Sequence, residues 1–150
     1  MLDSSRLFGI APTETTTSAR FYRFMTGGAG AMKTLLLVED DEALGYTLSR
    51  QLQAAGYDVM LANSSMSALN VLDSDRQIDF VIADTIMPKG QPNGLAFARI
   101  ARMKRLGIKV AFITGYTNLA LNDNTLCARV FYKPVDLEDL VAEIDTQLSA

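Results

Sequence analysis

Short apolar runs alternate with longer amphipathic stretches from residue 33 onward. The runs are three to five residues long, mostly aliphatic and with little polar alternation, which is typical of strands covered by helices on both faces. They predict five strands, at Thr34–Val38, Tyr57–Leu61, Phe80–Ala83, Lys109–Ile113 and Val130–Tyr132. Because strands that alternate with helices usually form parallel sheets, the pattern predicts repeated strand–helix–strand units.

The stretches between the runs carry apolar residues at helical spacing. In the first, Leu44, Leu48 and Leu52 recur every fourth residue, and Gly56 follows as a stop signal. We expect helices at about 42–55, 65–73, 94–106, 117–127 and 137–148. The fourth is the weakest, because Asn and Asp are poor residues for a helix interior. The sequence therefore predicts an α/β fold with a doubly wound five-stranded parallel sheet, a (βα)5 three-layer sandwich.

Residues 1–31 differ from the rest of the chain. They contain a Thr-rich stretch at 13–18 and a Gly/Ala stretch at 27–31, with no helical or strand period. Met32, just ahead of the first apolar run, fits a start residue. We expect residues 1–31 to be a disordered or misassigned extension and the folded domain to span 32–150.

Composition narrows the class of protein. With 150 residues, 49% of them hydrophobic, the chain can form one domain with one core. A net charge of −3 and a pI near 4.9 argue against direct DNA binding, which needs a basic surface. No apolar run approaches the roughly 18 residues of a membrane span. The single cysteine, Cys127, excludes an internal disulfide. We expect a cytoplasmic protein with no membrane segment.

Chemically active side chains follow four of the five predicted strands. They are Glu39, Asp40 and Asp41 after the first strand, Asp84 after the third, Thr114 after the fourth and Lys133 after the fifth. The carboxyl ends of parallel strands meet at one edge of the sheet, so these side chains should lie together. Clustered carboxylates repel one another unless a cation lies among them, and Mg²⁺ prefers oxygen ligands. Zinc and copper are disfavoured because the chain has no histidine.

Asp84 would lie nearest the centre of this cluster. A carboxylate there can attack phosphorus and form an acyl phosphate, while the metal and Lys133 neutralise the developing charge and Thr114 donates a hydrogen bond. Taken singly, each residue has an ordinary explanation. Asp41 fits a helix N-cap, Asp84 a turn residue and Lys133 a surface lysine. Their common edge favours the functional interpretation.

Four segments together resemble the receiver domains of two-component response regulators: Leu36–Asp41, Asp84–Pro88, Ile113–Tyr116 and Tyr132–Val135. The resemblance covers residues 33–150 and implies a flavodoxin-like fold. It also implies the roles of the site residues, with Glu39, Asp40, Asp84 and the backbone carbonyl of Ile86 as Mg²⁺ ligands, Asp84 as the phosphoacceptor, Thr114 as the switch hydroxyl and Lys133 as the phosphate contact. A cis peptide bond before Pro134 is a further implication.

Three departures from the family pattern concern the output surface. The loop Lys89–Asn93 is longer than usual, and the stretch between Thr114 and Lys133 is shorter. Many receivers carry Tyr or Phe where this chain has Val130, so an aromatic switch at that position is not expected. Tyr116 is a candidate for part of that role.

The resemblance implies a stand-alone response regulator. A sensor histidine kinase or phosphotransfer protein would phosphorylate Asp84 and switch a surface that binds an unknown protein target. No output domain is expected after the last helix, and a phosphorylation-dependent dimer fits the same scheme. The alternatives are a phosphate sink in a phosphorelay, a pseudo-receiver that binds without phosphorylation, and a Mg²⁺-dependent phosphatase. Such phosphatases need a second acid where this chain has Ile86, so we do not expect an enzyme.

Overall fold

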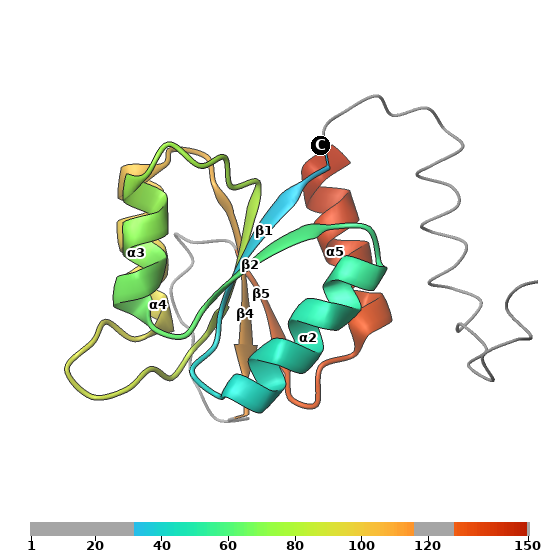
Figure 1. Ribbon diagram of the computed structural model, residues 1–150, viewed down its shortest axis with the longest axis horizontal. Coiled ribbons are helices and arrows are strands. Elements are labelled where there is room, and N and C mark those ends of the chain that lie inside the picture. The colour runs from blue at the N-terminus through green and yellow to red at the C-terminus, as the bar shows by residue number, and fades with distance from the viewer. Residues whose placement is uncertain (1–31, 116–127, 150) are drawn as a thin grey trace, which may run out of the picture.

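The computed structural model describes residues 32–115 and 128–149, which form a parallel sheet between two layers of helices (Figure 1). The sheet has the strand order β2-β1-β3-β4-β5. Its strands are β1 (Thr34–Val38), β2 (Asp58–Ala62), β3 (Phe80–Asp84), β4 (Lys109–Thr114) and β5 (Arg129–Tyr132). All five predicted strands are confirmed to within one residue at each end. The predicted extension 1–31, the predicted helix 117–127 and Tyr116 lie outside the described residues.

Helices cover both faces of the sheet. They are α2 (Glu42–Ala54), α3 (Ser65–Asp73), α4 (Gly94–Lys104) and α5 (Leu137–Ser149). In Figure 1, α2 and α5 lie on one face, and α3 and α4 lie on the other. The predicted doubly wound flavodoxin-like arrangement is therefore confirmed for the described part of the chain.

The core consists of two apolar clusters, one on each face of the sheet. Successive strand residues alternate between them: Leu35 and Leu37 join the α2/α5 cluster, whereas Leu36 and Val38 join the α3/α4 cluster. The central strand β3 is buried along its whole length. This two-sided burial explains why the strands are unbroken apolar runs in the sequence.

Side-chain caps begin all four described helices, with Asp136 capping α5 through the Asp139 N–H at 3.1 Å. Asp41, Ser64 and Asn93 each accept a hydrogen bond from the backbone N–H three residues later, at 3.0, 3.1 and 2.9 Å. The predicted N-cap role of Asp41 is confirmed. These caps place the starts of α2, α3 and α4 around the edge where the candidate site lies.

The end of α4 corrects one expectation. The helix ends at Lys104 rather than near 106, and the backbone of Arg105 is extended. Its guanidinium donates to the carbonyls of Leu72, Ser74 and Arg76 at 3.1, 2.8 and 2.6 Å. These carbonyls lie at or just beyond the end of α3, where unsatisfied acceptors and the negative end of the helix dipole favour a cation.

Arg105→Ala is expected to lower the free energy of unfolding by about 2 kcal/mol, because several carbonyls lose a charged donor. The matched control is Lys104→Ala, which removes only the exposed ion pair with Asp73 and should cost less than about 1 kcal/mol. Urea unfolding followed by circular dichroism measures both. Equal losses for the two variants would contradict the capping role of Arg105.

Candidate functional site at the carboxyl edge of the sheet

Three carboxylates converge where β1 and β3 end. Glu39 and Asp40 follow β1, and Asp84 is the last residue of β3. One carboxylate oxygen from each of the three lies within 4.8 Å of the others. Glu39 and Asp84 are 1% and 5% exposed, whereas Asp40 is exposed to solvent. The structure thus brings together three of the four predicted acidic residues, whereas the side chain of Asp41 caps α2.

Lys133 bridges the two buried acids from the end of β5. Its Nζ lies 2.7 Å from Asp84 Oδ2 and 3.0 Å from Glu39 Oε2. The following Lys133–Pro134 peptide bond is cis, as the family resemblance implies. Lys133 follows β5 directly, and its backbone N–H donates to the carbonyl of Thr114 at the end of β4, at 2.7 Å. This hydrogen bond to the sheet holds the backbone of Lys133 in position.

The second oxygen of each buried carboxylate accepts a hydrogen bond from the backbone. Glu39 Oε1 accepts from the N–H of Asp41, and Asp84 Oδ1 accepts from the N–H of Ile86, both at 3.1 Å. Each carboxylate is therefore held by one local amide and one distant ammonium, which orients an oxygen of each toward the shared cluster.

The charges in this cluster do not balance. Burial, followed by the nearby negative charge of Asp84, raises the pKa of Glu39 to about 7, although the Asp41 N–H and Lys133 act in the opposite direction. Burial alone would lower the pKa of Lys133, but its hydrogen bonds to Asp84 and Glu39 outweigh that effect and raise it. The single ammonium of Lys133 therefore does not fully stabilise the negative charges of the carboxylates around it.

These residues fit a hard divalent cation. The cluster offers only oxygen ligands. Burial disfavours the negative charge of Glu39, and a bound cation would stabilise that charge. The Ile86 side chain is exposed and its N–H is already bonded to Asp84. The role of its carbonyl as a further metal ligand stays a prediction.

Thr114 ends β4 next to the phosphoacceptor candidate, since Asp84 pairs with Ile113 in the sheet. Its side chain is fully buried, and its hydroxyl accepts a hydrogen bond from the Thr85 hydroxyl at 2.8 Å. Sequence reasoning did not single out Thr85. The only signal was its place directly after Asp84 at the end of an apolar run.

Gly94, the first residue of α4, was also missed as part of the site. A Cβ atom on this residue would lie 2.1 Å from the carbonyl oxygen of Asp84 and 2.8 Å from the Thr85 Cα. The Gly94 N–H donates to the Thr85 carbonyl at 3.1 Å. A glycine here lets the start of α4 pack directly against the backbone that carries Asp84.

The long loop Lys89–Asn93 is anchored to the neighbouring helix. The hydroxyl of Ser65, at the buried start of α3, donates to the carbonyl of Pro92 at 2.6 Å. Asn93 then caps α4. The loop beside Asp84 is therefore held at its C-terminal end by both helices on this face of the sheet.

Comparison with known proteins decides the family. The family model of the response regulator receiver domain matches residues 35–145. This chain belongs to that family. Receiver domains are signalling modules of two-component systems that are phosphorylated by kinases and bind Mg²⁺ at an acidic pocket. In this receiver Glu39, Asp40 and Asp84 form an acidic cluster.

Individual relatives agree with this assignment. The receiver is 36% identical over 122 residues to the response regulator receiver protein CpdR of Brucella abortus, covering 79% of this chain and 99% of CpdR. It is also 32% identical over 119 residues to the sensor kinase CckA of the same organism, covering 77% of this chain but only 12% of the kinase.

Solved structures show the same fold. A response regulator receiver protein from Sinorhizobium medicae aligns with a TM-score of 0.73 and 27% identity, covering 79% of this chain and 96% of that one. The receiver domain of the hybrid histidine kinase CckA aligns with a TM-score of 0.64 and 30% identity, covering 77% and 98%.

Val130 lies half-buried on β5 and packs against the α3/α4 cluster.

Within residues 32–115 and 128–149, no helix combines the length and apolarity needed to cross a bilayer.

Proposed function

We propose that this receiver is phosphorylated on Asp84 by a sensor histidine kinase or phosphotransfer protein, in a Mg²⁺-dependent and reversible reaction, and that phosphorylation switches a surface that binds a protein target. The observation that carries the proposal is the position of the Lys133 ammonium, 2.7 Å from Asp84 and 3.0 Å from Glu39. A cation so close to Asp84 can contact an oxygen of a phosphoryl group attached there.

The residues around Asp84 determine the chemistry. A carboxylate oxygen of Asp84 attacks phosphorus, the bond between phosphorus and the donor's leaving group breaks, and an aspartyl phosphate forms. Lys133 then moves its hydrogen bond from the carboxylate to a phosphoryl oxygen. Glu39, Asp40, Asp84 and the Ile86 carbonyl would hold Mg²⁺, whose positive charge would neutralise charge on the other phosphoryl oxygens.

Thr114 has the role of reporting the phosphorylated state. Its hydroxyl is bonded to Thr85 in the unphosphorylated chain. We expect it to donate to a phosphoryl oxygen once Asp84 is phosphorylated, which would shift the end of β4. The stand-alone arrangement predicted from the sequence is supported by the match to nearly the whole length of CpdR, and it remains part of the proposal.

Incubation with Mg²⁺ and a small acyl-phosphate donor, followed by intact mass spectrometry, tests the proposal. We expect a gain of one phosphoryl group in the presence of Mg²⁺ and none when the ion is chelated. No gain under either condition, with the small donor or with purified kinases, would favour the pseudo-receiver. Sustained release of phosphate from unrelated phosphate esters would point to a phosphatase instead.

A phosphate sink differs from a switch in the consequence of phosphorylation. A sink accepts phosphoryl groups from a phosphotransfer protein and loses them without any change in partner binding. Affinity capture with the phosphorylated and unphosphorylated forms therefore separates the two, since only a switch gains or loses a partner on phosphorylation.

A further inference from the structure

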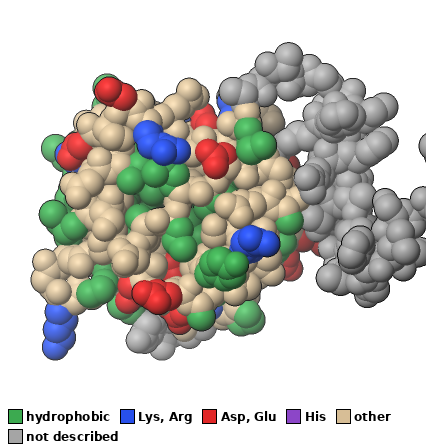
Figure 2. Space-filling view, viewed as in Figure 1, with side chains coloured by type: hydrophobic (Ala, Val, Ile, Leu, Met, Phe, Trp, Pro, Cys, Tyr) green, Lys and Arg blue, Asp and Glu red, His purple; other side chains and the backbone are tan. Residues whose placement is uncertain are grey.

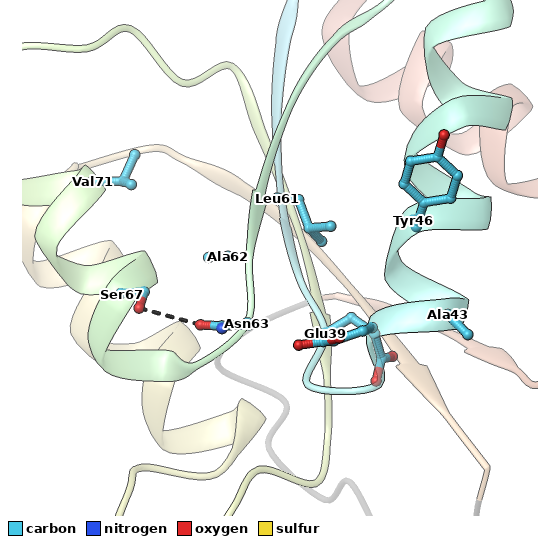
Figure 3. Close-up of a pocket in the computed structure, with 9 residues that line it drawn as sticks. Glu39, Ala43, Tyr46, Leu61, Ala62, Asn63, Ser67 and Val71 are labelled. Atoms are coloured by element: carbon cyan, nitrogen blue, oxygen red, sulfur yellow. Dashed lines mark hydrogen bonds between the residues drawn. The ribbon is translucent and has the colours of Figure 1, made fainter.

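The outer side of β2 forms one of the two edges of the sheet. No other strand in the described part of the chain pairs with this outer side. A groove of about 900 Å³ runs between α2 and α3 beside it, lined by Tyr46, Leu61 and Val71 among others (Figure 3). Hydrophobic side chains gather in the middle of this face (Figure 2). Tyr46 and Leu61 are 63% and 43% exposed.

The backbone of β2 is ready to pair with another strand. Asp58 donates its N–H to the Lys33 carbonyl, and Ala62 accepts from the Glu39 N–H, both at 3.0 Å, so these residues face β1. By the alternation of a strand, Val59 and Leu61 direct their N–H and C=O groups to the free edge. The sequence Asp-Val-Met-Leu-Ala has no lysine or proline, the residues that commonly block pairing at a sheet edge.

One face of α2 beside the groove carries an acidic residue at one end and a basic residue at the other, so its charges are complementary to those of a second, antiparallel copy. Glu42, Tyr46 and Arg50 are spaced four residues apart and so lie on one side of the helix. Glu42 and Tyr46 line the groove, and the Arg50 guanidinium lies over the Tyr46 ring, 5.9 Å from its centroid. A second copy of this helix running antiparallel would place the partner's Arg50 opposite Glu42, with the two tyrosines at the centre.

We infer that two copies of this chain associate through their β2 edges, about a two-fold axis near Met60. In that antiparallel register Val59 lies opposite the partner's Leu61, and both residues carry free backbone groups that can exchange hydrogen bonds. Their side chains form apolar cross-strand pairs on the α2 face. The same axis brings the two α2 helices side by side and pairs each Glu42 with the partner's Arg50. The proposal is independent of phosphorylation.

Sedimentation velocity of the full chain over a wide concentration range tests the inference. We expect a reversible monomer–dimer equilibrium without any phosphodonor. Glu42→Lys turns two attractive charge pairs into repulsive ones and should weaken the dimer at least about tenfold. The double variant Glu42→Lys with Arg50→Glu restores both pairs and should recover most of the affinity. A chain that stays monomeric at all concentrations would overturn the inference.

A second pair of variants tests the strand edge. Leu61→Lys places a charge at the pairing edge and should abolish the dimer, whereas Leu106→Lys, at a residue that is 92% exposed and does not line the groove, should leave it intact. Circular dichroism confirms that each variant is folded. A dimer that survives both Glu42→Lys and Leu61→Lys uses another surface, and the inference is then wrong.

Hydrogen exchange of the backbone amides distinguishes the possible occupants of the groove. Protection of the Val59 and Leu61 amides that increases with protein concentration supports pairing between copies. Protection that is already complete in the dilute monomer would mean that another segment of the same chain covers the edge, which contradicts the inference.

Discussion

Asp84→Asn is expected to abolish phosphoryl incorporation from an acyl-phosphate donor. The amide keeps the size of the carboxylate and can still accept from the Ile86 N–H, but it is not a nucleophile toward phosphorus. Since the proposed phosphorylation forms a bond to this side chain, the loss should be complete rather than partial. Intact mass spectrometry after incubation with Mg²⁺ and the donor measures it.

The matched control is Asp75→Asn, which removes an exposed carboxylate from the loop between α3 and β3. It should take up a phosphoryl group as the unmodified chain does. If Asp84→Asn were still phosphorylated to the same extent, another residue would be the acceptor, and the proposed function would need a different site. Circular dichroism checks that the Asp84→Asn protein is folded.

Gly94→Ala is expected to destabilise the fold strongly, although it adds a single methyl group. The new Cβ would lie 2.1 Å from the Asp84 carbonyl oxygen and 2.8 Å from the Thr85 Cα, and both of these are backbone atoms that cannot rotate away. Either α4 or the end of β3 must move. We expect the free energy of unfolding to fall by about 3 kcal/mol or more, measured by urea unfolding.

Gly45→Ala is the control for the effect of alanine in a helix. Gly45 is a buried glycine of α2, and the closest contact of its added Cβ would be the end of the Leu61 side chain, at 3.1 Å. Alanine favours helix formation over glycine by roughly 1 kcal/mol, so this variant should be neutral or slightly stabilising. A loss at Gly94 no larger than that at Gly45 would show that α4 does not pack closely on the backbone of Asp84.

Local patterns were enough to predict the described fold and the acidic part of the site. The strands are continuous apolar runs because both faces of the sheet are buried, and that pattern needs no knowledge of distant contacts. The carboxyl-edge rule then predicts that Glu39, Asp84 and Lys133 meet, and the ion pairs between them confirm it.

The features that the sequence did not reveal depend on contacts between segments far apart in the chain. Arg105, just past the end of α4, donates from its guanidinium to carbonyls at the end of α3, more than 30 residues away along the chain. Thr85 and Gly94 look ordinary in sequence, and only the packing of α4 against β3 gives them a place at the site. Contacts between distant backbone segments produce no periodic pattern in the sequence, so they cannot be predicted from it.

The burial of Glu39 lowers the stability of this receiver at alkaline pH. A carboxylate that is 1% exposed and whose pKa is raised to about 7 makes the folded state less favourable at alkaline pH than a neutral side chain of the same size would. A screen for heat-resistant variants, run in alkaline buffer without divalent cations, would therefore enrich neutral substitutions at this position. In the proposed function Glu39 is a Mg²⁺ ligand, so such variants would gain stability and lose that ligand, and selection for thermostability alone would act against the proposed phosphorylation.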